Sequence, residues 1–210
     1  TDRLHLTIPE FHSMRLRFRQ FEEALIEAES ERIIAASEWI EHVQLAAPTF
    51  IQLYEEVTSG NLPLRVTHND TKFNNVLLSD DGLSGCVIDL DTVMPGYTFF
   101  DVGDGLRSVG VQATEDDSNL TGIELSTANI EAFLAGYYDA TRNILTQKEI
   151  SLLPHSAAYM AFIQGVRFLA DYLNRDVYFK TSYDDHNLVR AQNQLTVSRL
   201  FQNHAFKPFS

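Results

Sequence analysis

The stretch HNDTKFNN, at residues 68–75, decides the fold of this chain together with VIDLD at residues 87–91. The first stretch supplies the carboxylate of Asp70 and, five residues later, the amide of Asn75. The second places Asp89 at the end of an apolar run, where a charge is costly unless it binds something. The two stretches together therefore indicate a polar site rather than two ordinary turns.

The segment between these stretches predicts how they meet. Asp80-Asp81-Gly82 is a turn signal between two short apolar runs, so residues 76–89 are predicted to form a β-hairpin. Because a hairpin brings its ends together, we expect Asn75 and Asp89 to converge on one ion. Cys86, the only cysteine, lies in the second run and is expected to be a small core residue.

Helical patterns flank this region on both sides. Residues 10–58 carry apolar side chains at three- and four-residue spacing, with Ser30 as the N-cap of a second helix and Pro48 at the start of a third. After residue 126, Ser126 or Thr127 caps a helix to about Asn143.

The C-terminal part continues the helical pattern. Thr146 and Glu149 form a capping-box pattern, and Pro154 is expected to break or bend the helix that follows. The strongly apolar residues 155–173 predict a buried helix, and a last helix is expected after Asp185. Phe99 and Phe100 are expected in the core.

These patterns predict a mostly α fold with a small β-hairpin region (α+β), organised as a single domain over residues 1–210. Within it, residues 1–59 are helical, residues 60–105 hold the loop and hairpin, and residues 106–210 are again helical. Apolar residues make up 44% of the chain, enough for a packed core. A cysteine-based metal site is excluded because only one cysteine is present.

Charge excludes one class of partner and leaves others open. The formal net charge of -13 argues against a nucleic-acid surface, which needs clustered Lys and Arg. No apolar stretch is long enough for a membrane span, and no leader precedes the first helix. We expect a soluble, cytoplasmic protein that acts on a small molecule.

The polar residues of the two stretches match the needs of phosphoryl transfer from ATP. That reaction requires a carboxylate to orient the acceptor hydroxyl, oxygen ligands for Mg²⁺, and a cation against the developing charge. Asp70 supplies the carboxylate, Asn75 and Asp89 supply oxygen ligands, and Lys72 supplies the cation. Asp91 is a second acid beside the predicted metal site.

The pattern H-x-D-x-x-x-x-N, followed by a hairpin and IDxD, resembles the catalytic and metal-binding elements of the kinase-like fold. THNDTKFNNVLL and VIDLDTVMPGYTFFDVGDGLR resemble the aminoglycoside phosphotransferase and choline kinase superfamily, and within it most closely the N-acetylhexosamine 1-kinase group. GVRFLADYLNRDVYFKTSYDDHNLVRAQNQ is similar to the C-terminal part of that group. The resemblance covers roughly residues 60–200 and implies the C-terminal lobe of the protein-kinase-like fold.

The resemblance implies roles for individual residues in the loop and hairpin. Asp70 is the catalytic base, Lys72 contacts the transferred phosphate, and His68 braces the loop. Asn75 and Asp89 are the Mg²⁺ ligands. Two further acids complete this set: Asp91 is implied as an additional ligand or organiser, and Asp101 as the anchor of the catalytic loop.

The residues that recognise the acceptor are expected near the buried C-terminal helix. The segment similar to the hexosamine kinases contains five candidates for the sugar site: Arg167, Asp171, Tyr172, Tyr178 and Lys180. Arg167 and Asp171 are also spaced i and i+4, so a purely structural ion pair is the alternative interpretation.

A kinase-like enzyme also needs a first lobe with a Gly-rich loop and a strand lysine. The chain has no glycine before Gly60 and no lysine before Lys72, so residues 1–59 cannot contain either element. We therefore expect a C-terminal fragment of a longer enzyme, whose partner is the nucleotide lobe of the same polypeptide. Weak ATP binding and negligible turnover are expected for this chain alone.

The first hypothesis is an ATP- and Mg²⁺-dependent kinase that phosphorylates the anomeric hydroxyl of an N-acetylhexosamine. A kinase for an aminoglycoside, choline or homoserine-like alcohol is the alternative within the fold. A non-catalytic kinase-like binding module is the alternative outside enzymes. A metal-dependent hydrolase would use the same acids, but the loop spacing favours transfer from a nucleotide.

Overall fold

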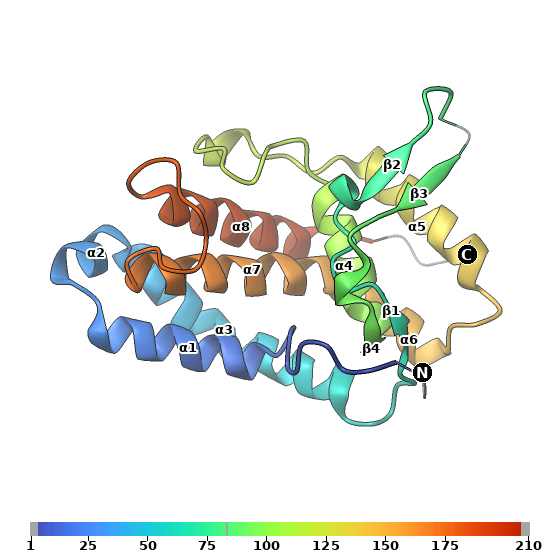
Figure 1. The fold of residues 1–210 in the computed structure, drawn as a ribbon, viewed down its shortest axis with the longest axis horizontal. Coiled ribbons are helices and arrows are strands. Elements are labelled where there is room, and N and C mark those ends of the chain that lie inside the picture. Colours follow the sequence, from blue (N-terminus) through green and yellow to red (C-terminus); the bar gives the residue numbers. More distant parts are fainter. Residues whose placement is uncertain (1–3, 83, 207–210) are drawn as a thin grey trace.

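The computed structural model describes residues 4–82 and 84–206, and within them the chain is mostly helical with two small antiparallel sheets. Figure 1 shows α7 and α8 lying side by side, with α1 and α3 along one flank and the strands gathered at one end. The helices are α1 (Met14–Glu27), α2 (Ser30–Ala35), α3 (Ser37–Thr58), α4 (Thr98–Val109), α5 (Thr127–Thr141), α6 (Gln147–Leu152), α7 (Ser156–Leu173) and α8 (His186–Asn203). The strands are β1 (Arg65–Thr67), β2 (Val76–Leu78), β3 (Gly85–Val87) and β4 (Met94–Gly96). Short 3₁₀ turns are η1 (Phe73–Asn75), η2 (Leu90–Thr92), η3 (Leu120–Gly122) and η4 (Leu153–His155).

Helix α7 is the centre of the core because it is apolar on nearly every face. Almost all of its side chains are buried, against α8 on one side and α1 and α4 on the others. Phe162 of α7 stacks on Phe50 of α3 with ring centroids 4.1 Å apart, and Tyr159 packs edge-on against Phe99. Phe99 and Phe100 are both buried, which confirms their expected place in the core.

The capping signals of the C-terminal half are confirmed. Ser126 accepts the backbone N–H of Asn129 at the start of α5, and Thr146 and Glu149 form the reciprocal capping box of α6. Pro154 lies in η4, so the helix is interrupted where the proline was expected to break it. Helix α8 follows Asp185 as predicted.

Two boundaries in the N-terminal half differ from the sequence prediction. Pro48 does not start a helix but lies inside α3, which continues because buried Val43, Ala47 and Phe50 hold both sides of it in the core. The lost hydrogen bond is offset by this packing. Ser30 is the first residue of α2 rather than its N-cap.

The predicted hairpin is confirmed as β2 paired antiparallel with β3, with Val76 opposite Val87. Its turn closes through the N–H of Gly82, which donates to the carbonyl of Ser79 at 2.8 Å. Gly82 has a φ of 69°, the left-handed conformation that suits glycine. Leu83, also within the predicted hairpin, lies outside the described residues.

The expectation that Cys86 is a core residue is wrong. All three residues of β3 are exposed, in a two-stranded hairpin that projects at the end of the molecule where the strands gather, as Figure 1 shows. Strand β4, which the sequence did not indicate, pairs antiparallel with β1. This second pair fixes the start of the 68–75 loop, because Thr67 at its end lies opposite Met94.

In the part of the chain that is described, no helix has the length and apolar character needed to cross a membrane.

Candidate functional site

The loop after β1 is held in an unusual backbone conformation at Asn69. This residue has a φ of 66°, a left-handed value that asparagine tolerates better than most residues. Its side-chain amide donates to the carbonyl of Thr67 at 3.2 Å and to that of Thr92 at 3.1 Å. The amide therefore ties the loop to both flanking segments, and the turn it fixes aims the next residue, Asp70, outward.

Asp101 anchors the same loop from α4. Its two carboxylate oxygens accept the backbone N–H groups of His68 at 2.9 Å and Asn69 at 2.7 Å. Its carbonyl accepts the hydroxyl of Thr71 at 2.6 Å. Burial raises the pKa of the Asp101 carboxyl, although the two N–H donors act in the opposite direction. The structure thus places Asp101 directly under the loop that the resemblance assigns to catalysis.

His68 connects the loop to the end of the hairpin. Its Nε2 lies 2.9 Å from the carbonyl oxygen of Ile88, and its Nδ1 lies 3.3 Å from the backbone nitrogen of Asp70. A carbonyl can only accept and a backbone N–H can only donate, so the proton of the neutral ring is on Nε2. This tautomer makes His68 a brace between the residue before Asp89 and the backbone of Asp70.

Asp70, Lys72 and Asn75 are in direct contact. The Oδ2 atom of Asp70 accepts Lys72 Nζ at 2.8 Å and the amide nitrogen of Asn75 at 2.9 Å. The Asn75 amide nitrogen also donates to the Asp70 carbonyl at 2.8 Å. Because this nitrogen is turned toward Asp70, the amide oxygen of Asn75 is turned away from it and can serve as a ligand.

Asp89 lies next to this group. The backbone N–H of Ile88 donates to the carbonyl of Asn75 at 2.9 Å, which brings Asp89 to the end of the strand pair beside Asn75. Asp89 is exposed, with a φ of 62°, so it follows β3 rather than lying inside the strand. Asp91 is exposed in η2. The two ends of the hairpin therefore meet as expected.

Electrostatics keep Lys72 protonated. Burial would lower its pKa, but the hydrogen bond with Asp70 and the charges of Asp70, Asp104 and Asp89 outweigh burial and raise the pKa. Because the charge of Asp89 raises the pKa of Lys72, the end of the hairpin must face the loop. The site thus combines a fixed cation with three acids around it.

The chemistry of the donor set fits a magnesium ion. Within residues 4–82 and 84–206, no group of three or more His, Cys, Asp or Glu side chains is arranged to hold a metal alone. Mg²⁺ commonly takes only one or two protein ligands and completes its shell with phosphate oxygens and water. An exposed carboxylate at Asp89 and an amide oxygen at Asn75 meet that requirement, whereas a closed protein cage is not formed.

A cleft of about 290 Å³ opens beside Asp70 and Lys72. Its wall includes Asp104 and Arg107 of α4, which are strongly buried. Arg107 donates to Asp104 Oδ1 at 2.8 Å and to Glu115 at 3.1 Å. Asp104 Oδ2 is buried and has no hydrogen-bond partner within the described residues. An acceptor hydroxyl entering the cleft is the kind of donor this oxygen lacks.

Sequence reasoning missed Asp104, Arg107 and also His12, whose Nε2 lies 3.1 Å from the carbonyl of Asn69. Burial lowers the pKa of His12 to about 4, so the ring is neutral and braces the 68–75 loop from the N-terminal segment. A signal for Asp104 and Arg107 exists in FFDVGDGLR, where charges recur at three-residue spacing on an apolar helix. His12 has no comparable local signal.

Of the five predicted acceptor-side residues, Arg167 lies in the wall of the Asp70 cleft. Its guanidinium stands over the rings of Phe11 and Phe179, at 5.8 Å and 5.4 Å. Asp171 accepts the backbone N–H groups of Tyr178 at 2.8 Å and Phe179 at 2.9 Å. These contacts order the segment after α7 and differ from the i, i+4 ion pair that the spacing left open.

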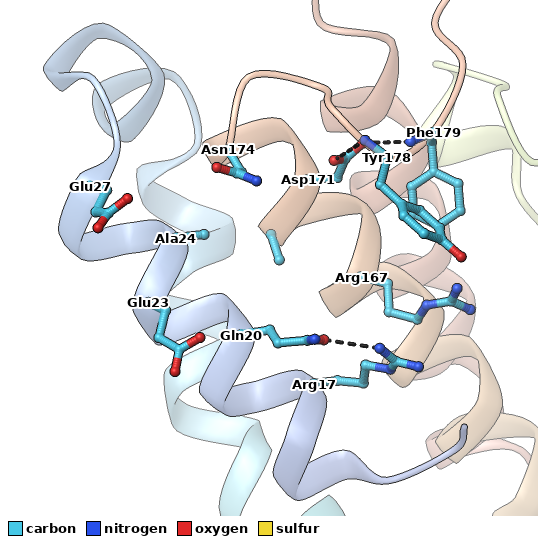
Figure 2. A pocket seen from close by; sticks show the side chains of 11 residues that line it. Arg17, Gln20, Glu23, Ala24, Glu27, Arg167, Asp171, Asn174, Tyr178 and Phe179 are labelled. Atoms are coloured by element: carbon cyan, nitrogen blue, oxygen red, sulfur yellow. Dashed lines mark hydrogen bonds between the residues drawn. The ribbon is translucent and has the colours of Figure 1, made fainter. Parts of the chain in front are cut away.

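The remaining three predicted acceptor-side residues lie in different places. Tyr178 lines a second cavity, which Figure 2 shows, and Arg167 belongs to the walls of both this cavity and the cleft. Tyr172 is buried beneath Arg32, whose guanidinium lies 4.6 Å from the ring centroid, so the structure places it away from both cavities. Lys180 is exposed and lines neither of them. Roles for these residues in acceptor binding stay predictions.

Comparison with known protein families gives a match that covers the site. The family model described as "Phosphotransferase enzyme family" (APH) matches residues 3–142, about two thirds of the chain. The matched range contains the loop, the hairpin, Asp101 and the α4 residues of the cleft.

Proposed function

The chain belongs to the phosphotransferase enzyme family, and on that premise we propose that it carries the catalytic part of a small-molecule kinase. The proposed reaction transfers the γ-phosphoryl group of ATP to the anomeric hydroxyl of an N-acetylhexosamine and gives the sugar 1-phosphate and ADP. The observation that supports it most is the contact of Asp70 with Lys72 and Asn75, beside Asp89.

In this proposal Asp70 orients the acceptor. One carboxylate oxygen is engaged by Lys72 and Asn75, which leaves Oδ1 to accept the proton of the acceptor hydroxyl. The acceptor oxygen forms a bond to the γ-phosphorus while the bond from that phosphorus to the β-phosphate oxygen breaks. The proton passes to Asp70, and Lys72 offsets charge on the transferred group.

Asn75 and Asp89 would hold Mg²⁺, with Asp91 as an additional ligand or as an organiser of Asp89. When bound, the ion neutralises charge on the nucleotide phosphates. His68 and Asp101 are positioning residues, because both contact the loop backbone and keep Asp70 aligned with the hairpin end. The exposure of Asp89 suits a ligand that must also reach a bound nucleotide.

The cleft supports an acceptor with several hydroxyl groups. Asp104 Oδ2 is an unpaired buried acceptor, Arg167 is a donor, and Phe179 offers an apolar ring face. Hexoses are commonly bound by this combination of polar groups and one aromatic face. Asp171 in the last turn of α7, and Tyr178 and Lys180 in the segment that follows it, are also proposed to contribute to acceptor binding.

We also propose that a nucleotide-binding lobe of the same polypeptide covers the strands. Apolar side chains on this part of the molecule are half or more exposed: Leu64, Val66, Phe73, Leu77, Leu78, Val87 and Leu90. Contiguous exposed apolar surface beside a polar site marks a place where another protein part packs. The adenine and the outer phosphates would be held by that lobe.

The experiment is a turnover assay on a polypeptide that joins this chain to its nucleotide-binding lobe. It compares N-acetylglucosamine, N-acetylgalactosamine, choline and an aminoglycoside as acceptors with Mg-ATP. Asp70→Asn should reduce turnover by about 10³-fold or more with the unfolding midpoint nearly unchanged. Turnover equal to that of the parent would remove Asp70 from the mechanism, and a preference for choline or the aminoglycoside would replace the sugar.

A parallel titration tests the need for the lobe. Calorimetry of this chain alone with Mg-ATP should give weak or undetectable binding and negligible turnover. Robust turnover by this chain alone would show that the strands are not a docking surface for a nucleotide-binding lobe.

A further inference from the structure

A cavity of about 520 Å³ lies between α1, α7 and the segment that follows α7, outside the Asp70 cleft. Arg167 and Phe179 line both hollows, so the cavity and the cleft adjoin at these two residues. Figure 2 shows Arg17 of α1 and Arg167 of α7 gathered at one end of it, near Tyr178. The other end, toward α2, carries Glu23 and Glu27 on α1.

The two arginines have only neutral partners. Arg17 donates to the side-chain carbonyl of Gln20 and to the backbone carbonyl of Phe11, each at 3.0 Å. Arg167 donates to the side-chain carbonyl of Gln164 at 3.0 Å. Within residues 4–82 and 84–206, neither guanidinium forms an ion pair with an acid. The Nε atom of Arg17 is also buried without a hydrogen-bond partner there.

The acids of the cavity are not placed to neutralise this pair. Both carboxylate oxygens of Asp171 are occupied by the backbone N–H groups of Tyr178 and Phe179 and by the amide of Asn187. Glu23 lies 3.9 Å from Arg19, and the side chains of both residues are mostly exposed. Burial lowers the pKa of both Arg17 and Arg167, and the charge of Arg167 lowers that of Arg17 further. Two cations therefore share a partly dry space, and within residues 4–82 and 84–206 the acids Glu10, which acts on Arg17, and Glu115, which acts on Arg167, do so without forming an ion pair.

We propose that this end of the cavity binds a carboxylate or phosphate group between the guanidiniums of Arg17 and Arg167. Guanidinium groups match the planar oxygens of such anions and bind them through paired hydrogen bonds. The buried Nε of Arg17 would gain the acceptor that it lacks. Because the cavity and the cleft share Arg167 and Phe179 in their walls, the anion is a substituent of the acceptor, such as an acidic group on an N-acetylated sugar; this part rests on the proposed function.

The test is calorimetric titration of this chain with three probes. Inorganic phosphate reports a free anion, N-acetylglucosamine a neutral sugar, and N-acetylmuramic acid the same sugar with a carboxylate. We expect the carboxylated sugar to bind at least tenfold more tightly than the neutral one. If phosphate binds but the carboxylated sugar binds no more tightly than the neutral one, the site binds a free anion. That result would contradict its assignment as a subsite for the acceptor.

Substitutions assign the binding to the arginine pair. Arg17→Gln and Arg167→Gln should each weaken anion binding about tenfold or more, which corresponds to the loss of one charged hydrogen bond. Arg17→Lys keeps the positive charge but lacks the paired N–H donors of the guanidinium, so it should weaken anion binding less than Arg17→Gln does. Arg19→Gln, the same change of charge on the exposed face of α1, should bind the anion like the parent.

The result that overturns the inference is anion binding that is absent at millimolar concentration or unchanged by Arg17→Gln and Arg17→Lys. Asp70→Asn separates this outcome from a failure of the proposed function. That variant should lose turnover in the polypeptide joined to its nucleotide-binding lobe and should keep anion binding, because Asp70 does not line the cavity between α1 and α7.

Discussion

The imidazole of His12 donates a hydrogen bond to the backbone carbonyl of Asn69 at 3.1 Å, across 57 positions of the sequence. Since the acceptor is a carbonyl, the Nε2 atom of His12 carries the proton. The hydroxyl of Tyr159 donates to the carbonyl of His12 at 2.7 Å and fixes the segment on the core helix α7. The segment before α1 thus supports the 68–75 loop through Asn69, the residue immediately before Asp70.

The neutral state of His12 predicts a loss of stability in mild acid. Its pKa is lowered to about 4 in the folded chain, while the unfolded chain binds a proton near 6.5. Between these values the unfolded state binds more protons, so the free energy of unfolding falls as the pH falls from 6.5 to 4. The contribution of His12 to this fall is about 2 kcal/mol between pH 7 and pH 5.

Urea unfolding at pH 7 and pH 5 measures this contribution. His12→Gln should lose it, because the glutamine amide can still donate to Asn69 and does not titrate. His42→Gln is the comparison: burial also lowers the pKa of the partly buried His42 to about 4, so this variant should lose a similar pH dependence through a residue of α3. Equal pH dependence in His12→Gln and in the parent would contradict the prediction.

A second pH effect involves Glu149, which holds β1 against α6. Its carboxylate accepts both Arg65 Nε at 2.7 Å and Arg65 Nη2 at 2.8 Å, and it caps α6. Burial would raise the pKa of Glu149, but the hydrogen bonds from Arg65 and Thr146 outweigh burial and lower it to about 2. The stability it provides is complete above pH 4.5 and is lost as the pH falls from 4.5 to 2.

Glu149→Gln should therefore lower the free energy of unfolding at pH 7 by about 3 kcal/mol, because Arg65 loses a buried partner. Glu56→Gln is a matched control, since Glu56 pairs with Lys148 in a surface contact that is about half-exposed. That variant should change stability by less than about 1 kcal/mol. Chemical denaturation compares the two, and similar losses would show that burial does not decide the difference.

Removal of the Asp101 carboxylate should loosen the catalytic loop. Asp101→Ala leaves the N–H groups of His68 and Asn69 without their acceptor, at a cost of about 2–4 kcal/mol. Amide exchange of His68 and Asn69 should become faster in Asp101→Ala than in the parent, while amide exchange in the α7 core stays the same. Asp139→Ala, which removes an exposed carboxylate on α5, should alter neither quantity. Unchanged exchange at His68 and Asn69 would show that Asp101 does not hold the loop.

Close packing of α4 against α7 predicts opposite effects for two glycines. A Cβ at Gly103 would lie 2.4 Å from the carbonyl oxygen of Ser156, which is backbone and cannot easily move. Gly103→Ala should therefore destabilise the fold by about 1–3 kcal/mol. At Gly136 in α5, nothing lies within 4 Å of the added Cβ, so Gly136→Ala should stabilise the helix by up to about 1 kcal/mol. Thermal unfolding of both variants measures the contrast.

The sequence predicted the helical segments well where capping residues and apolar spacing agreed. Ser126 and Thr146 mark helix starts because their side chains satisfy backbone N–H groups within three residues. The predictions failed where tertiary packing overrides a local preference, as at Pro48 inside α3. Cys86 was misplaced because an apolar strand looks the same in sequence whether or not another layer covers it.

The spacing of Asp70, Lys72 and Asn75 by itself determined their contact. Lys72 follows Asp70 by two residues and Asn75 by five, and one loop with one short turn brings side chains at these spacings together. The hairpin signal likewise determined that Asp89 returns to Asn75. Only the tertiary structure decided what surrounds Asp70. His12 before α1, Asp104 in α4 and Arg167 in α7 are far apart in the sequence, and their convergence depends on how these parts of the chain pack, which local patterns do not encode.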